Sequence, residues 1–181
     1  MRLVFLDRDG VIVRFPGRGR YVIRKNQIHV LPAALKGIRL LTEAGVQLHV
    51  ISNQGCVSHG LITNRELKLF TDLMLRRIRR AGGDIRRVHY CVHRSADGCK
   101  CKKPKTLLLK RAIRGTGVRR RDVFFVGDSE VDVEAGRRFG CKTVLVLTGR
   151  TKKHEVKKLP FKPDVVHKDL EEAARWILKR K

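Results

Sequence analysis

Short apolar segments of strand length alternate with segments of helical length along this 181-residue chain. The strand-like segments are RLVFL at 2–6, VQLHVIS at 46–52, VHYCV at 88–92, DVFFVGDS with its exit at 122–129, KTVLVLTG at 142–149 and PDVVH at 163–167. A helix between two strands allows both strands to run in the same direction in one sheet. The alternation therefore predicts a parallel sheet. We therefore expect an α/β fold in which helices cover both faces of that sheet.

Residues typical of helix ends mark the helical segments. Pro32 stands where a first helix would begin, and Gly45 stands where it would stop. Thr63 and Glu66 form a capping box at the start of the next helix. Further helices are expected at 105–114, at 130–139 and in DLEEAARWIL, with Asp169 and Glu172 as its capping residues. No linker or internal repeat divides the chain, which predicts one domain over 1–181.

Charge and the N-terminal segment limit the classes of protein to consider. The chain has 42 Lys and Arg against 17 Asp and Glu, a net charge of +25, so at least half of the cations have no acidic partner within the chain. Either a basic solvated surface or a nucleic-acid partner would account for them. The basic residues are spread along the chain and aromatic residues are few, which disfavours nucleic acid. The N-terminal apolar run, LVFL, is too short for a signal peptide or a membrane span, and we expect a cytoplasmic protein.

Polar side chains follow the first four expected strands, at the edge where parallel sheets bind ligands. They are Asp7 and Asp9 after the first strand, Ser52, Asn53 and Gln54 after the second, Lys102 and Lys103 beyond the third, and Asp128 and Asp132 after the fourth. Carboxylates from neighbouring strand ends are typical ligands of Mg²⁺, and a hydroxyl, an amide and a lysine suit phosphate oxygens. This set predicts phosphoryl transfer with a carboxylate nucleophile and a second carboxyl as acid and base.

Three cysteines and a histidine are grouped in the pattern C-x-H-x5-C-x-C, formed by Cys91, His93, Cys99 and Cys101. Four such ligands suit a tetrahedral Zn²⁺ ion and leave no position for a catalytic water, so the expected site is structural. A disulfide or a pair of redox thiols is the alternative. The remaining cysteines, Cys56 and Cys141, receive no role.

The ordered motifs FLDRDGVIV, ISNQG, CKKP and VGDSEVD resemble those of the haloacid dehalogenase-type phosphatases over nearly the full length of the chain. The resemblance implies a Rossmann-like three-layer sandwich and a Mg²⁺-dependent phosphatase that forms an aspartyl-phosphate. It makes Asp7 the nucleophile and Asp9 the acid and base, with Ser52 and Lys103 on the phosphoryl group. Asp7, the carbonyl of Asp9 and Asp128 would bind Mg²⁺, with Asp132 in support.

The cysteine-rich loop at 91–101 is similar to the zinc loop of two related groups, the heptose 1,7-bisphosphate phosphatases and the histidinol-phosphate phosphatases. This resemblance implies the absence of a large cap domain and a small phosphorylated metabolite as substrate, with a heptose bisphosphate ahead of histidinol phosphate. A nucleic-acid 3′-phosphatase stays as a third alternative because of the charge. We expect a monomer.

Several residues around the expected site are candidates for substrate contacts. His59 stands where the heptose bisphosphate phosphatases usually have arginine, and Lys102 stands where both related groups usually have it. Arg18 and Arg20 in a long loop could hold a second phosphate. The full set of expected contacts is Arg8, Arg18, Arg20, Asn53, Gln54, Gly55, His59, Lys102 and Ser129.

Overall fold

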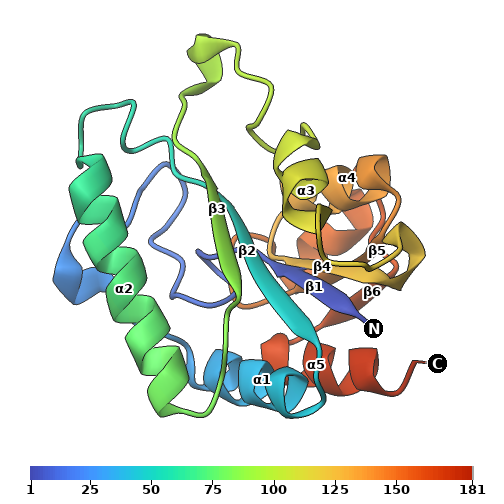
Figure 1. Ribbon diagram of the computed structural model, residues 1–181. Coiled ribbons are helices and arrows are strands. Elements are labelled where there is room, and N and C mark those ends of the chain that lie inside the picture. Colours follow the sequence, from blue (N-terminus) through green and yellow to red (C-terminus); the bar gives the residue numbers. More distant parts are fainter. Residues whose placement is uncertain (181) are drawn as a thin grey trace.

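The protein folds as a six-stranded parallel sheet with helices on both faces (Figure 1), in a computed structural model that describes residues 1–180. The strands are β1 (Leu3–Leu6), β2 (Gln47–Asn53), β3 (Arg87–Cys91), β4 (Val123–Gly127), β5 (Lys142–Val146) and β6 (Val165–His167). Their order is β3-β2-β1-β4-β5-β6, and every neighbouring pair is parallel. The expected α/β architecture with a parallel sheet is therefore confirmed.

Four α-helices connect these strands, and a fifth follows the last strand. They are α1 (Pro32–Glu43), α2 (Asn64–Arg80), α3 (Leu107–Ile113), α4 (Glu130–Phe139) and α5 (Leu170–Leu178). Short 3₁₀ turns lie at Lys25–Gln27, Ser95–Asp97, Arg120–Asp122 and Lys153–Lys158. The capping box of Thr63 and Glu66 opens α2 as expected, and the Asp169 side chain accepts a hydrogen bond from the amide of Glu172 at the start of α5.

Alternate residues of the central strands face two large apolar cores on opposite sides of the sheet, which gives the molecule its three layers. Val4 and Leu6 of β1 pack with α1, α2 and α5, whereas Leu3 and Phe5 pack with α3 and α4 on the opposite face. Because both faces are covered, the central strands are apolar without interruption. None of the helices within residues 1–180 has the length and apolar character needed to cross a membrane.

The order of the strands places the site. β1 lies between β2 and β4 in the sheet, with Leu6 opposite both Val50 and Val126. The chain moves outward to β3 on one side of β1 and to β6 on the other, so the connections diverge at the carboxyl end of β1. In open α/β sheets this point of divergence is where ligands bind.

One buried histidine gives the core a testable pH dependence. His49 of β2 is inaccessible to solvent, its ring lies 6.3 Å from that of Phe5 and 6.0 Å from that of His89, and neither of its nitrogens has a hydrogen-bond partner. Burial, with the nearby His89 and Arg87 charges, lowers the pKa of His49 to about 4. The folded pKa is below the unfolded value, so stability is complete above pH 6.5 and falls as the pH approaches 4.

We expect the His49→Leu protein to lose less stability on acidification than the unchanged protein. The difference at pH 4.5, relative to pH 7, should be roughly 2 kcal/mol in the free energy of unfolding. Urea unfolding at the two pH values measures it, with the exposed His29→Leu as the control. An equal acid loss in the His49→Leu and unchanged proteins would contradict this account.

Candidate active site

Asp7 lies at the carboxyl end of the central strand β1 and faces a buried lysine. The Lys103 ammonium is 2.9 Å from Asp7 Oδ1 and 2.6 Å from Asp132 Oδ1, and it donates a third contact to the carbonyl of Ile51 at 2.9 Å. Only 4% of Lys103 is exposed. Its cation is therefore held between two carboxylates rather than in solvent.

Lys103 is also fixed through its backbone. Its amide donates to Asn53 Oδ1 at 3.0 Å, and its carbonyl accepts from Asn53 Nδ2 at 3.1 Å. Asn53 is the last residue of β2, so these two bonds tie the segment after the cysteine-rich loop to the sheet. The position of the Lys103 side chain thus depends on β2 as well as on its own loop.

Three carboxylates gather beside this lysine. Asp7, Asp128 and Asp132 each present an oxygen within 4.8 Å of the others, and all three residues are buried. Burial raises the pKa of Asp7 to about 6 despite the opposing charge of Lys103, and Asp132 and Asp9 add repulsion. Burial likewise raises the pKa of Asp128 well above its usual value, with repulsion from Asp132 and Asp7. The single cation of Lys103 does not balance three buried carboxylates. A hard divalent cation such as Mg²⁺, which prefers oxygen ligands, would supply the missing positive charge.

Asp7 differs from Asp132 in the partners of its carboxylate oxygens. The buried Oδ1 of Asp7 has no hydrogen-bond partner in addition to its ion pair. In contrast, both oxygens of Asp132 are taken, Oδ1 by Lys103 and Oδ2 by the amide and hydroxyl of Ser129 at 3.2 and 2.6 Å. Asp132 therefore orients Lys103 and the start of α4.

Two glycines press against the carboxyl group of Asp128. A Cβ atom at Gly10 or at Gly149 would lie 2.1 or 1.9 Å from Asp128 Oδ2, closer than any real contact. The amide of Arg150 donates to the same oxygen at 2.6 Å. Any side chain at position 10 or 149 would displace Asp128, and Gly10 also has a φ of +91°, which disfavours other residues.

A cavity of about 160 Å³ opens above these groups. Of the residues that the sequence predicts for the site, those that line it are Asp7, Asp9, Arg20, Ser52, Asn53, Lys103, Asp128, Ser129 and Asp132. Phe15, Pro16, Tyr21, Val131 and Arg150 also line it and were not expected. Arg150 comes shortly after β5, so the rule used for the other strand ends would have found it.

The other predicted contacts do not line this cavity. Arg8 and Gln54 are buried beside Asp9, and Arg18 lies in a neighbouring cavity, where it pairs with Glu155 at 2.6 Å. Gly55 is buried and His59 is exposed. The Lys102 ammonium is 3.4 Å from the carbonyl of His93 in the cysteine-rich loop. Their predicted contacts with a substrate stay predictions.

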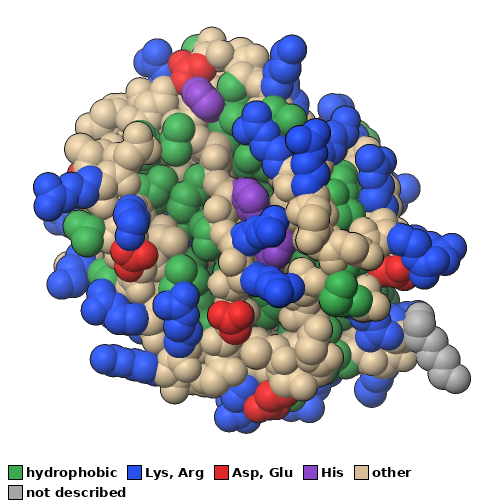
Figure 2. Space-filling model, viewed as in Figure 1, with side chains coloured by type: hydrophobic (Ala, Val, Ile, Leu, Met, Phe, Trp, Pro, Cys, Tyr) green, Lys and Arg blue, Asp and Glu red, His purple; other side chains and the backbone are tan. Residues whose placement is uncertain are grey.

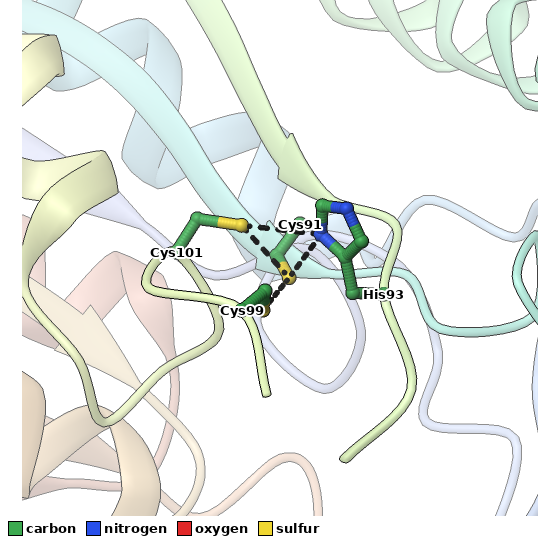
Figure 3. A group of neighbouring side chains, drawn as sticks. All are labelled: Cys91, His93, Cys99 and Cys101. Atoms are coloured by element: carbon green, nitrogen blue, oxygen red, sulfur yellow. Dashed lines mark hydrogen bonds between the residues drawn. The ribbon is translucent and has the colours of Figure 1, made fainter. Parts of the chain in front are cut away.

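The four zinc-ligand candidates lie together at the end of β3 and in the loop that follows. Figure 3 shows their side chains pointing toward one another. Cys101 Sγ is 3.3 Å from both Cys91 Sγ and His93 Nδ1, and Cys91 Sγ is 3.6 Å from Cys99 Sγ. Ligands at tetrahedral corners around zinc would lie about 3.7 Å apart, so the set fits the ion. All five cysteines are free thiols, which does not match the disulfide alternative.

Known proteins resemble this chain in sequence and in structure. The HAD-hydrolase-like family profile matches residues 100–173. The D-glycero-beta-D-manno-heptose-1,7-bisphosphate 7-phosphatase of Neisseria meningitidis serogroup A is 34% identical over 153 residues, which are 84% of this chain and 81% of the relative. The enzyme of the same name from Pseudomonas aeruginosa is 33% identical over 158 residues, 87% and 88% of the two chains.

The crystal structure of D,D-heptose 1,7-bisphosphate phosphatase from B. bronchiseptica, complexed with magnesium and phosphate, has a TM-score of 0.90 to this chain. It is 30% identical, and the match covers 99% of both chains. These similarities agree with the carboxylate and lysine arrangement at the end of β1. The chain therefore belongs to the D-glycero-D-manno-heptose-1,7-bisphosphate 7-phosphatase family of HAD-like hydrolases and is a phosphoric monoester hydrolase.

Proposed function

We propose that this protein is a Mg²⁺-dependent phosphatase that removes one phosphoryl group from a sugar bisphosphate, D-glycero-D-manno-heptose 1,7-bisphosphate being the leading substrate. The observation that carries the proposal is the arrangement at the end of β1. There Asp7 lies 2.9 Å from the buried Lys103 in a cavity that Asp9 and Asp128 also line. A carboxylate nucleophile, an acid and a buried cation are the groups that phosphoryl transfer requires.

In the first step a carboxylate oxygen of Asp7 attacks phosphorus, and the bond from phosphorus to the sugar oxygen breaks. Asp9 gives its proton to that oxygen as it leaves. The Lys103 ammonium and the Ser52 hydroxyl hold the phosphoryl oxygens, and Asn53 keeps Lys103 in place. The products are the dephosphorylated sugar position and an aspartyl-phosphate on Asp7.

In the second step water attacks the phosphorus of the aspartyl-phosphate, and Asp9, now ionised, accepts the water's proton. The bond from phosphorus to Asp7 breaks, inorganic phosphate leaves, and Asp7 returns as a carboxylate. Asp9 has regained the proton that it lost in the first step. Acid and base work by one residue requires that its carboxyl group face the cavity in both steps.

Asp7, the Asp9 carbonyl and Asp128 are the groups that would hold Mg²⁺. The bound ion would offset the negative charge of the phosphoryl group and allow a carboxylate to approach it. Asp7 Oδ1, which has no partner other than the Lys103 ammonium, and the raised pKa of Asp128 support this assignment. Asp132 would act on Lys103 rather than on the ion.

A second phosphate on the substrate would meet arginines at the rim of the cavity. Arg20 and Arg150 line it and are exposed, and in residues 1–180 no acidic side chain is hydrogen-bonded or ion-paired to the guanidinium group of either one. Guanidinium groups bind phosphate through paired hydrogen bonds. Arg18 is less available because Glu155 already neutralises it.

We further propose that Cys91, His93, Cys99 and Cys101 hold a structural zinc ion, since four protein ligands leave no open position for water. The whole chain, 1–181, would act as one domain and as a monomer. Free thiols suit a reducing compartment, which supports a cytoplasmic location. Lysines and arginines are scattered over the face in Figure 2 rather than gathered in one stripe, which favours a small metabolite over nucleic acid as the partner.

A phosphate-release screen tests the proposal directly. Heptose 1,7-bisphosphate, other sugar bisphosphates, histidinol phosphate and 3′-phosphorylated oligonucleotides would be compared by kcat/KM. Preference for a sugar bisphosphate supports the assignment. Preference for histidinol phosphate would overturn the substrate assignment but not the assignment as a phosphatase. The same holds for preference for the oligonucleotide, if that activity falls steeply at higher salt.

Brief EDTA treatment should stop turnover, and Mg²⁺ alone should restore it without refolding. The sheet already assembles the carboxylates, so removal of the ion should change the charge of the site and not its fold. Phosphate release and circular dichroism before and after treatment provide the measurement, with buffer-treated protein as the control. Recovery with Zn²⁺ alone, or a loss of helical signal on chelation, would contradict this division between the two metals.

A further inference from the structure

Two of the residues expected to touch substrate are instead buried against the proposed acid. Arg8 is 1% exposed and Gln54 is inaccessible, and neither lines the cavity. Arg8 Nε donates to Asp9 Oδ1 at 3.0 Å, and Arg8 Nη2 donates to Asp9 Oδ2 at 2.9 Å. Gln54 Nε2 donates to the same Oδ2 at 2.9 Å. The Asp9 carboxyl group thus accepts three hydrogen bonds from buried donors that do not line the cavity.

These donors are unequally shared between the two oxygens of Asp9. Oδ2 accepts two hydrogen bonds and Oδ1 accepts one. A carboxylate oxygen has two lone pairs, so among the protein donors in residues 1–180 Oδ1 retains a free acceptor position. This makes Oδ1 the oxygen that exchanges a proton with the leaving group and with water.

Gln54 also sets the direction of the Ser52 hydroxyl. The second amide proton of Gln54 Nε2 points to Ser52 Oγ at 3.1 Å. An amide NH₂ group only donates, so Ser52 must accept this bond. Its own proton is left for an acceptor in the cavity, such as a phosphoryl oxygen. One buried amide therefore connects the acid to the hydroxyl that holds the phosphoryl group.

A contribution to stability does not by itself account for the buried Arg8. Its Nη1 is buried without a hydrogen-bond partner, and its other neighbour is the ring of Tyr90, with the guanidinium carbon 5.9 Å from the ring centre. A buried ion pair with an unsatisfied donor contributes little to stability compared with apolar packing. The gain lies in orientation, because the planar fork fixes both oxygens of Asp9 at once.

We propose that Arg8 and Gln54 are positioning residues, which act on the substrate only through Asp9 and, for Gln54, also through Ser52. This inference rests on the proposed function, because it assigns them to the acid and base of that reaction. A positioning role of this kind predicts which steps of the reaction each substitution slows. Loss of Arg8 should slow only the proton transfers that Asp9 carries out, and should leave attack by Asp7 unchanged. Loss of Gln54 should slow those proton transfers most, and should slow attack by Asp7 to a smaller extent, because Ser52 holds the phosphoryl group.

The test compares two esters in the first turnover of the full-length protein with Mg²⁺ bound. The leaving group of 2,4-dinitrophenyl phosphate departs as a stable anion and needs no proton, whereas the sugar oxygen of heptose 1,7-bisphosphate does. In Arg8→Lys and Gln54→Met we expect first-turnover cleavage of the sugar ester to fall by about 10²-fold. First-turnover release of dinitrophenolate should change by less than about threefold in Arg8→Lys, and in Gln54→Met it should fall much less than cleavage of the sugar ester does. The exposed Arg39→Lys should change neither.

A double-mutant cycle separates positioning from contact. In an Asp9→Asn background, Arg8→Lys should cause no further loss on the sugar ester, because the residue through which it acts has already been removed. Gln54→Met should cause there only the smaller loss that it causes with dinitrophenyl phosphate, which is the part that acts through Ser52. A further loss from Arg8→Lys, a larger further loss from Gln54→Met, or an equal loss of both esters in either single variant would overturn the inference. If Arg8→Lys fails to fold, the uncharged Gln54→Met carries the comparison alone. Failure of the unchanged protein to cleave either ester would instead overturn the proposed function.

Discussion

Replacing Asp7 with asparagine should reduce turnover by about 10⁴-fold or more, since no other carboxylate can take its place as nucleophile. Asp128 is pressed against Gly10 and Gly149, and both oxygens of Asp132 are bonded to protein donors. Neither can move to the position of Asp7 at the end of β1. The loss should appear in kcat with sugar bisphosphate and with dinitrophenyl phosphate alike.

The same substitution should leave the fold intact. Burial disfavours the charge of Asp7, as its raised pKa shows, and Lys103 keeps its ion pair with Asp132 after the change. We therefore expect a midpoint of thermal unfolding at or above that of the unchanged protein. The exposed Asp84→Asn serves as the matched control for loss of one carboxylate. Substantial turnover by a folded Asp7→Asn protein would rule out the aspartyl-phosphate route.

The second large effect is expected at the cysteine-rich loop, where Cys99→Ser should remove zinc and destabilise the protein. Metal analysis of the unchanged protein should find about one zinc per chain, and much less in the variant. Zinc contributes about 10 kcal/mol or more to small zinc-dependent peptides. This loop is anchored at β3 and, through Lys103, at β2, so we expect a smaller loss, about 3 kcal/mol or more in the free energy of unfolding.

Activity should respond less than stability to the loss of zinc. Cys101 is close to Lys103 in the chain, but the two hydrogen bonds to Asn53 still hold Lys103. We expect turnover below the unfolding temperature to fall by about tenfold, which is a typical effect of losing a supporting shell. Cys141→Ala, which removes a thiol outside the cysteine-rich loop, should keep its zinc. A Cys99→Ser protein with full zinc content and unchanged stability would exclude the structural site.

The sequence predicted the fold because its signals were local and consistent with one another. Strand-length apolar segments alternated with capped helices, and a parallel sheet is the arrangement that accommodates them. Strand ends were less exact. The expected strand at 163–167 is only Val165–His167, and α3 begins at Leu107 instead of 105 because the amide of Lys105 closes a turn on Lys102.

The site followed from the sheet for residues whose distance from a strand end fixes their place. Asp7, Ser52 and Asp128 come together because their strands are neighbours in register. The inward orientation of Arg8 and Gln54 could not be read in this way, because it depends on the turn after the strand and on Tyr90 from β3. Tyr21 and Phe15 reach the cavity from a long loop that has no periodicity to interpret.

The central position of β1 in the sheet determines at which stage of unfolding this site is disrupted. Its residues bond on both sides to strands that are themselves covered, so amide hydrogens near Asp7 can exchange only when the whole sheet opens. Asp7, the proposed nucleophile, is therefore expected in the last part of the molecule to unfold, whereas the loop that carries Arg20 and Tyr21 lies outside the strands and helices. The proposed chemistry and the proposed binding of a second phosphate would then depend on segments of different local stability.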